Sequence, residues 1–155
     1  MRIITTLETL LNEQAAAGLI KGHRYTWGAK ADNILGTLTP QSFPFAVLLT
    51  PQAWRLECDT QTAREVGTFS VFYLVPQTEL DFDAVSNEAL IDGCIDCAVD
   101  MVARCQRSHA VHVENVEVAG ESLYDANNKN LTGCRLNITL KENQGRCLKI
   151  APPLP

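Results

Sequence analysis

The sequence predicts an α+β domain in which a mostly antiparallel sheet packs on one long helix and on an N-terminal helix. Apolar side chains between residues 86 and 107 recur every three or four positions, which indicates one face of a long helix. Segments with alternating apolar residues follow one another through short turns, which favours antiparallel strands. The chain has 155 residues, a length typical of one domain with its own core.

The predicted helix 86–107 is the element around which the other segments are arranged. Ser86 is its candidate N-cap, and Arg104 and Arg107 lie at its C-terminal end, where cations stabilise the helix dipole. The residues of its apolar stripe are Leu90, Cys94, Cys97, Ala98, Met101, Val102 and Cys105. A sheet wrapped on this stripe is the simplest architecture.

A first helix is predicted over residues 5–18. Thr5 and Glu8 have the spacing of a capping box, which marks a helix start. Gly18 can adopt the left-handed conformation that ends a helix.

Strands are predicted between and after the two helices. Residues 59–65 are expected to form a loop and residues 126–130 a turn, and Asn115 interrupts an alternating pattern, which indicates a bulge. The predicted strands are 23–27, 45–49, 54–58 (half-buried), 66–75, a strand from 111 onward, 134–140 and 147–150. The predicted core contains Leu90, Cys94, Ala98, Met101, Phe45, Val47, Leu49, Val71, Leu136 and Ile138.

Residues 31–44 show no clear period and are rich in Gly, Thr and Pro, which predicts a long loop. This loop carries Ile34, Leu35 and Leu38 in polar surroundings, a pattern suited to burial against a neighbouring molecule. We expect one domain over residues 1–150 and an extended, proline-rich tail over residues 151–155.

Composition narrows the class of function. Hydrophobic residues make up 46% of the chain and charged residues 20%, which is typical of a globular protein. The formal charge of −5 argues against sequence-independent binding to nucleic acid, and specific nucleic-acid binding is not expected either. No apolar run is long enough for a membrane span, and no signal peptide is recognisable, so a cytoplasmic protein with reduced cysteines is expected.

Cys94 and Cys97 form a C-x-x-C sequence. In redox proteins this motif opens a helix, whereas here it lies two turns inside one, on the apolar stripe. Burial in the core is therefore the favoured interpretation, and a thiol or redox role is the alternative. No disulfide between the two is expected, because cysteines three apart in a regular helix have poor bridging geometry.

No other pattern predicts a catalytic residue, a metal site or a cofactor. His109 and His112 lack a carboxylate at a recognised ligand spacing. Asp125, Asn127 and Lys129 follow calcium-loop positions only in part, and a hairpin turn is the better interpretation. The sequence thus favours a protein that is not an enzyme.

Asp92, Asp96 and Asp100 are successive i,i+4 neighbours on the polar face of the long helix. Like charges at this spacing are mildly unfavourable. A solvated face is one interpretation, and a contact with a basic partner or with another copy of the chain is the sharper one.

A turn followed by a strand, together with an apolar strand after an N-terminal helix, resembles small tail proteins of siphophage-like viruses and prophages, especially those integrated in Bacteroidetes. The element order of helix, strands, long helix and hairpin is similar to that of the tail terminator family. The segments that carry the resemblance are Tyr124–Asp125, residues 130–133 (Asn-Leu-Thr-Gly), the strand 134–140 and residues 44–49 (Pro-Phe-Ala-Val-Leu-Leu).

The resemblance implies a structural protein without an active site. Tail terminators form rings, commonly hexamers, that cap the tail tube and join it to the head. The implied partners are other copies of the chain, the tail tube and head-completion proteins. The implied location is the host cytoplasm and then the virion tail.

Two other classes of function stay open. One is a thiol or redox enzyme that uses Cys94 and Cys97, which a fast-reacting cysteine of low pKa would favour. The other is a small α+β ligand-binding domain, which a large apolar pocket between helix and sheet would favour.

Overall fold

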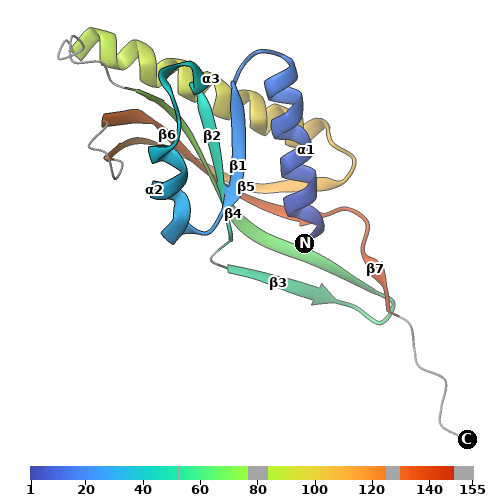
Figure 1. Cartoon of the computed structure of the whole chain (residues 1–155). Coiled ribbons are helices and arrows are strands. Elements are labelled where there is room, and N and C mark those ends of the chain that lie inside the picture. Colours follow the sequence, from blue (N-terminus) through green and yellow to red (C-terminus); the bar gives the residue numbers. More distant parts are fainter. Residues whose placement is uncertain (52, 77–83, 125–129, 149–155) are drawn as a thin grey trace, which may run out of the picture.

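The structure is a computed structural model that describes residues 1–51, 53–76, 84–124 and 130–148. The described residues form an α+β domain, as the sequence predicts (Figure 1). Its elements are α1 (Arg2–Ala16), β1 (Gly22–Thr26), α2 (Gly28–Gly36), the 3-10 helix η1 (Pro40–Ser42), β2 (Phe45–Leu49), β3 (Ala53–Cys58), β4 (Thr62–Pro76), α3 (Ala84–Arg107), β5 (Val111–Tyr124), β6 (Asn130–Glu142) and β7 (Arg146–Cys147).

The strands form one mixed sheet in which β4 is the central member. The strand order is β1-β2-β4-β6-β5, and β3 and β7 also pair with β4. The C-terminal half of β4 pairs with β2, and the N-terminal half of β4 pairs with β3. These two short strands therefore lie along the same side of β4. All pairs are antiparallel except β1 with β2, which α2 and η1 connect. A connection of this kind returns the chain to the same end of the sheet, as parallel pairing requires.

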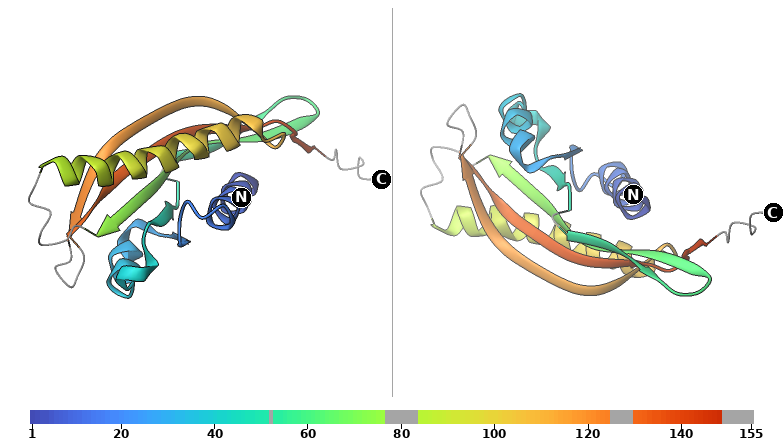
Figure 2. Two further views of the ribbon diagram at one scale, coloured as in Figure 1. Left: turned by 90° about the horizontal axis from the view of Figure 1, so that it is seen from above. Right: turned by 90° about the horizontal axis from the view of Figure 1, so that it is seen from below.

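Helices cover both faces of the sheet. The helices α1 and α3 pack with Ala46, Leu48 and alternate residues of β4 and β6 in the larger cluster. The other face of β2 carries Phe45 and Val47, and α2 covers it in a smaller cluster. We call these the α1/α3 face and the α2 face. Figure 2 shows β4, β6 and β5 side by side as one curved layer, with α1 and α2 beside β1 and β2.

Several predicted elements are confirmed. The strand β2 has the predicted bounds, and α3 begins two residues before the predicted residue 86. A register shift lies between Val113 and Asn115, as the interrupted alternation indicates. All members of the predicted core are buried except Leu90 and Leu49, which are partly buried. Residues 125–129, which include most of the predicted turn, and residues 149–155, which include the predicted tail, lie outside the described residues.

The predicted start of the first helix is wrong. Helix α1 begins at Arg2, so Thr5 lies inside it, and the Thr5 hydroxyl donates to the Met1 carbonyl at 3.3 Å rather than capping the helix. The helix extends to Arg2 because Ile3 and Ile4 are buried and continue its apolar stripe. Gly18 does adopt a left-handed conformation, with φ of 79°, just after the helix ends.

The predicted long loop 31–44 is also wrong, because helix α2 and the 3-10 helix η1 occupy most of it. Leu35 is buried, and Ile34 and Leu38 are partly buried against the same cluster. These apolar residues therefore pack against the sheet of their own chain. Their three- and four-residue spacing is helical, but the surrounding Gly, Thr and Pro residues obscured it.

The strand β3 differs from the predicted half-buried strand. Trp54 and Leu56 are 53% and 43% exposed. The reason is that β3 is an outer strand, paired among the described residues only with the N-terminal half of β4, and it lies apart from the helices (Figure 1). Most of the predicted loop 59–65 also belongs to this hairpin, because β4 begins at Thr62 and the carboxylate of Asp59 closes the turn by accepting the backbone N–H of Thr62 at 2.6 Å.

Substitution at Leu35 tests whether α2 belongs to the core. Leu35→Ala removes a buried side chain and should lower the free energy of unfolding by about 2–5 kcal/mol. Urea denaturation measures this, with exposed Lys30→Ala on the same helix as the control, where an effect within about 0.5 kcal/mol is expected. Equal effects of the two substitutions would show that Leu35 does not pack inside the domain.

Candidate functional site

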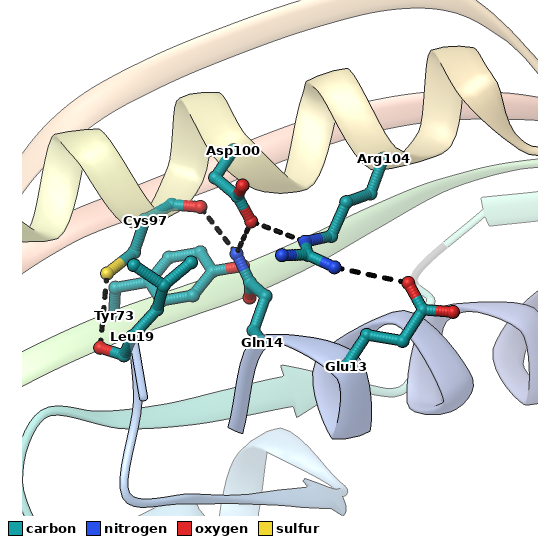
Figure 3. A network of polar contacts seen from close by, with 7 residues as sticks. All are labelled: Glu13, Gln14, Leu19, Tyr73, Cys97, Asp100 and Arg104. Carbon is teal, nitrogen blue, oxygen red and sulfur yellow. Dashed lines mark hydrogen bonds and ion pairs between the residues drawn. The ribbon is translucent and has the colours of Figure 1, made fainter. Parts of the chain in front are cut away.

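A buried polar network ties α1 to α3 and β4 (Figure 3). The Tyr73 hydroxyl donates to Gln14 Oε1 at 2.9 Å, and both residues are fully buried. Gln14 Nε2 in turn donates to the carbonyl of Cys97 at 2.8 Å and to Asp100 Oδ2 at 2.9 Å. Every polar atom of the Gln14 side chain thus has a partner, which identifies the network as structural.

Asp100 belongs to this network. Arg104 Nε donates to Asp100 Oδ2 at 2.6 Å, and Arg104 Nη1 lies 3.2 Å from Glu13 Oε2 on α1. Burial alone would raise the pKa of Asp100, but hydrogen bonds from Arg104 and Gln14 outweigh it and lower the pKa. Asp100 is therefore engaged within the chain. Of the three predicted aspartates, only Asp92 and Asp96 are exposed and open to a partner.

The cysteines divide into a buried and an exposed group. Cys94, Cys97, Cys105 and Cys134 are buried free thiols, whereas Cys58 and Cys147 are exposed. Burial is the main cause that raises the pKa of Cys94, Cys105 and Cys134 to about 12 and that also raises the pKa of Cys97. The Cys97 thiol donates to the Leu19 carbonyl at 3.6 Å. These shifts are opposite to those of a reactive thiol and agree with core packing of the C-x-x-C sequence.

The two histidines considered in the sequence, His109 and His112, are exposed. His23 lies 2.8 Å from Asn12 Oδ1, and its pKa is lowered, chiefly by burial. Within the described ranges, no three His, Cys, Asp or Glu residues lie close enough together to hold a metal ion.

Two buried carboxyl groups, Glu65 on β4 and Glu142 on β6, were not found from the sequence. Their side chains hydrogen-bond each other. Glu65 Oε2 also accepts from the Arg2 backbone N–H at 2.8 Å and from Arg146 Nη2 at 3.0 Å. The pair therefore fastens the start of α1 and strand β7 to the sheet. The available signal was that Glu65 lies on the buried side of β4, in step with Gly67 and Phe69.

The two carboxyl groups have opposite pKa shifts. Burial opposes ionisation of Glu65, but the hydrogen bonds from Glu142, the Arg2 backbone and Arg146 outweigh it and lower the pKa. For Glu142, burial and then the neighbouring Glu65 raise the pKa. Such a pair suits acid–base chemistry in principle. Here the Arg2 backbone N–H and the Arg146 guanidinium both hydrogen-bond to the Glu65 carboxylate. We therefore call the pair the Glu65–Glu142 clamp, because it holds α1 and β7 on the sheet.

The depressions in the described surface differ in volume and in the polarity of their lining. An open hollow of about 530 Å³ lies beside Arg2, His109 and Glu142, and a polar one of about 520 Å³ lies on the α2 face of β4, β6 and β5. The apolar pocket between α2 and the sheet holds about 150 Å³. Pockets for drug-sized ligands hold roughly 300–1,000 Å³. The size of this apolar pocket therefore disfavours the ligand-binding interpretation.

The edges of the sheet are the most open feature of the chain. In the part of the chain that the structure describes, no strand pairs with the outer side of β1, β3 or β5. We call the outer sides of Gly22–Thr26 and Val111–Tyr124 the β1 edge and the β5 edge. The β5 edge runs for 14 residues. Unpaired edges of this length are templates for pairing with another chain, so they are the candidate interaction site.

No protein-family model matches the chain, and no curated protein does. Among the described residues, no helix is long and apolar enough to cross a membrane.

Thiol labelling of the native protein tests the assignment of the cysteines. Cys58 and Cys147 should react rapidly, whereas Cys94 and Cys97 should react only after denaturation, because a thiol of raised pKa has little thiolate at neutral pH. In a variant carrying Cys58→Ser and Cys147→Ser, rapid labelling should disappear. Rapid labelling of Cys94 or Cys97 in that variant would instead support the thiol-enzyme interpretation.

Substitution at Glu142 tests the carboxyl pair. Because its pKa is raised in the folded state, Glu142 contributes stability below the ordinary value of 4.5, and that contribution is lost as the pH rises through the raised pKa. Glu142→Gln keeps a donor for Glu65 without a charge, so it should be more stable than the wild type at neutral pH.

The gain in stability of Glu142→Gln over the wild type should vanish below the ordinary glutamate pKa, where both proteins carry a neutral side chain at position 142. Urea denaturation at about pH 7 and about pH 4 measures both expectations. Exposed Glu114→Gln is the matched control and should behave as the wild type. A Glu142→Gln protein less stable than the wild type at neutral pH would contradict the raised pKa.

Proposed function

We propose that this chain is a structural assembly protein of the tail-terminator type, which forms a closed ring through the edges of its sheet. The observation that carries the proposal concerns the terminal strands β1 and β5, each of which has an outer side that no strand of the described residues pairs with. A subunit with open edges at both ends of one sheet can bind a further copy at each end. Repeated head-to-tail contacts of this kind close into rings when the rotation between copies allows it.

The element order supports the same assignment. An N-terminal helix precedes an apolar strand and a hairpin, and the long helix α3 precedes the β5–β6 hairpin. This order is similar to that of tail terminators. The additional helix α2 is a departure from the predicted order, and its apolar residues contribute to the core. The ring is therefore assigned to the sheet edges alone, without the segment 31–44.

The interior of the domain supports a structural role. The Gln14 network and the Glu65–Glu142 clamp use their polar groups on contacts between helices and strands. The buried thiols have raised pKa values. These groups stabilise the fold, and the surface is left to carry the function.

The proposed partners are other copies of the chain, in a ring of the hexameric kind, together with the tail tube and head-completion proteins. The chain acts in the host cytoplasm and remains in the virion tail. Its net charge of −5 suits a ring through which DNA passes, because an acidic surface does not retain a polyanion.

Removal of the gene from the virus or prophage that encodes it tests the proposal. Electron microscopy of induced cells should show tails of irregular or excessive length that are not joined to heads. A plasmid copy of the wild-type gene should restore normal tails. Tails of normal length joined to heads in the absence of the protein would contradict the proposal.

A further inference from the structure

We propose that the ring contact is a head-to-tail pairing in which the β5 edge of one copy binds the β1 edge of the next copy. This inference rests on the proposed function and specifies the surfaces that meet. Both strands end the same sheet, on opposite sides of β4 and β6 (Figure 2). Pairing them would continue the sheet from one copy into the next.

Strand directions are compatible with this continuation. β1 runs parallel to β2, and each step from β2 to β4, β6 and β5 is antiparallel. It follows that β1 and β5 run in opposite directions within one chain. A copy added in the same orientation therefore meets its neighbour through an antiparallel pair, the more stable ladder of the two kinds. The same orientation also keeps the α1/α3 faces of the two copies on one side.

On the α1/α3 face, both edges carry exposed apolar side chains. Val116 and Val118 are in register with the buried residues Ile138 and Leu136, and they are 37% and 36% exposed. On β1, Tyr25 is in register with buried Leu48 and is 40% exposed. Pairing of an aromatic residue with β-branched residues across strands is favourable, so burial of these side chains together would stabilise the contact.

On the α2 face, the two edges carry opposite charges. Arg24 on β1 is in register with Val47 of this face, and exposed Lys30 follows on α2. Glu117 on β5 is in register with Asn137, which lines the polar hollow of the same face. Exposed Glu114 precedes it at the register shift and adds a second negative charge to the β5 edge. None of these four side chains takes part in an ion pair in the described parts of the chain.

Charge also favours a contact between a β1 edge and a β5 edge over a contact between two identical edges or one that uses β3. Two β5 edges placed together would bring acidic groups face to face, and two β1 edges would do the same with basic groups. Only the mixed contact is attractive, and such a heterologous contact is the kind that generates rings. The third edge, on β3, offers no similar match, because Arg55 and Lys141 already contact Glu57 at 2.8 and 2.5 Å.

Charge reversal followed by mixing tests this contact. One variant carries Arg24→Glu and Lys30→Glu, and the other carries Glu114→Lys and Glu117→Lys. Each should associate roughly tenfold or more weakly than the wild type, because each brings like charges together at the β1–β5 contact. An equal mixture should associate again, since alternating copies restore opposite charges at every contact. Sedimentation velocity over a series of protein concentrations measures association.

The same experiment includes two control variants and has outcomes that would contradict the inference. Arg64→Glu and Glu88→Lys reverse exposed charges away from both edges and should associate as the wild type does. Recovery in the mixture shows that both variants are folded. The inference is overturned if the wild type stays monomeric at every concentration, if the variants associate as well as the wild type, or if the mixture does not recover.

Failure of this inference is distinguishable from failure of the proposed function. Variants that still form rings would leave the assembly role intact and move the contact to another surface. Normal tails without the gene would remove the tail role, while the β1–β5 contact could still be measured in solution.

Discussion

The pairing of β4 with four other strands is the constraint on which the rest of the structure depends. This strand spans 15 residues, with β2 and β3 along one side and β6 and β7 along the other. Both sides of β4 are therefore paired. In the described residues, the backbone N–H and C=O groups without a strand partner lie on the outer strands β1, β3 and β5. Because exposed backbone groups of this kind favour pairing with another chain, the placement of β4 determines where a partner can bind.

The same strand supplies the anchors that hold the helices. Tyr73 contacts Gln14 of α1, and Gln14 contacts Cys97 and Asp100 of α3. Glu65, at the other end of β4, receives the backbone N–H of Arg2 at the start of α1. An unpaired buried polar group would cost about 1–3 kcal/mol, so these contacts fix the helices in one position. The polar groups of the interior are thereby engaged in contacts between helices and strands.

Local sequence patterns predicted the helices and strands whose buried residues recur at a single regular spacing. The strand β2 and the stripe of α3 were found because their apolar residues recur at strand and helix spacing. Helix α2 was missed because turn-forming residues surround its three- and four-residue apolar spacing. The exposure of Trp54 was missed because alternation cannot tell whether another layer covers a strand. The Glu65–Glu142 clamp was missed because the two residues are 77 positions apart in the sequence. The charges of β1 and β5 could not be assigned to sheet edges from the sequence, because that assignment requires the strand order.

Amide hydrogen exchange, compared between dilute and concentrated protein, tests the central claim that assembly uses the two terminal strands. The account predicts that peptides covering Gly22–Thr26 and Val111–Tyr124 become more protected as the concentration rises. Peptides covering α2 and β3 should exchange at the same rate under both conditions. Protection confined to α2 or β3, or no change in β1 and β5 when the protein associates, would contradict the account.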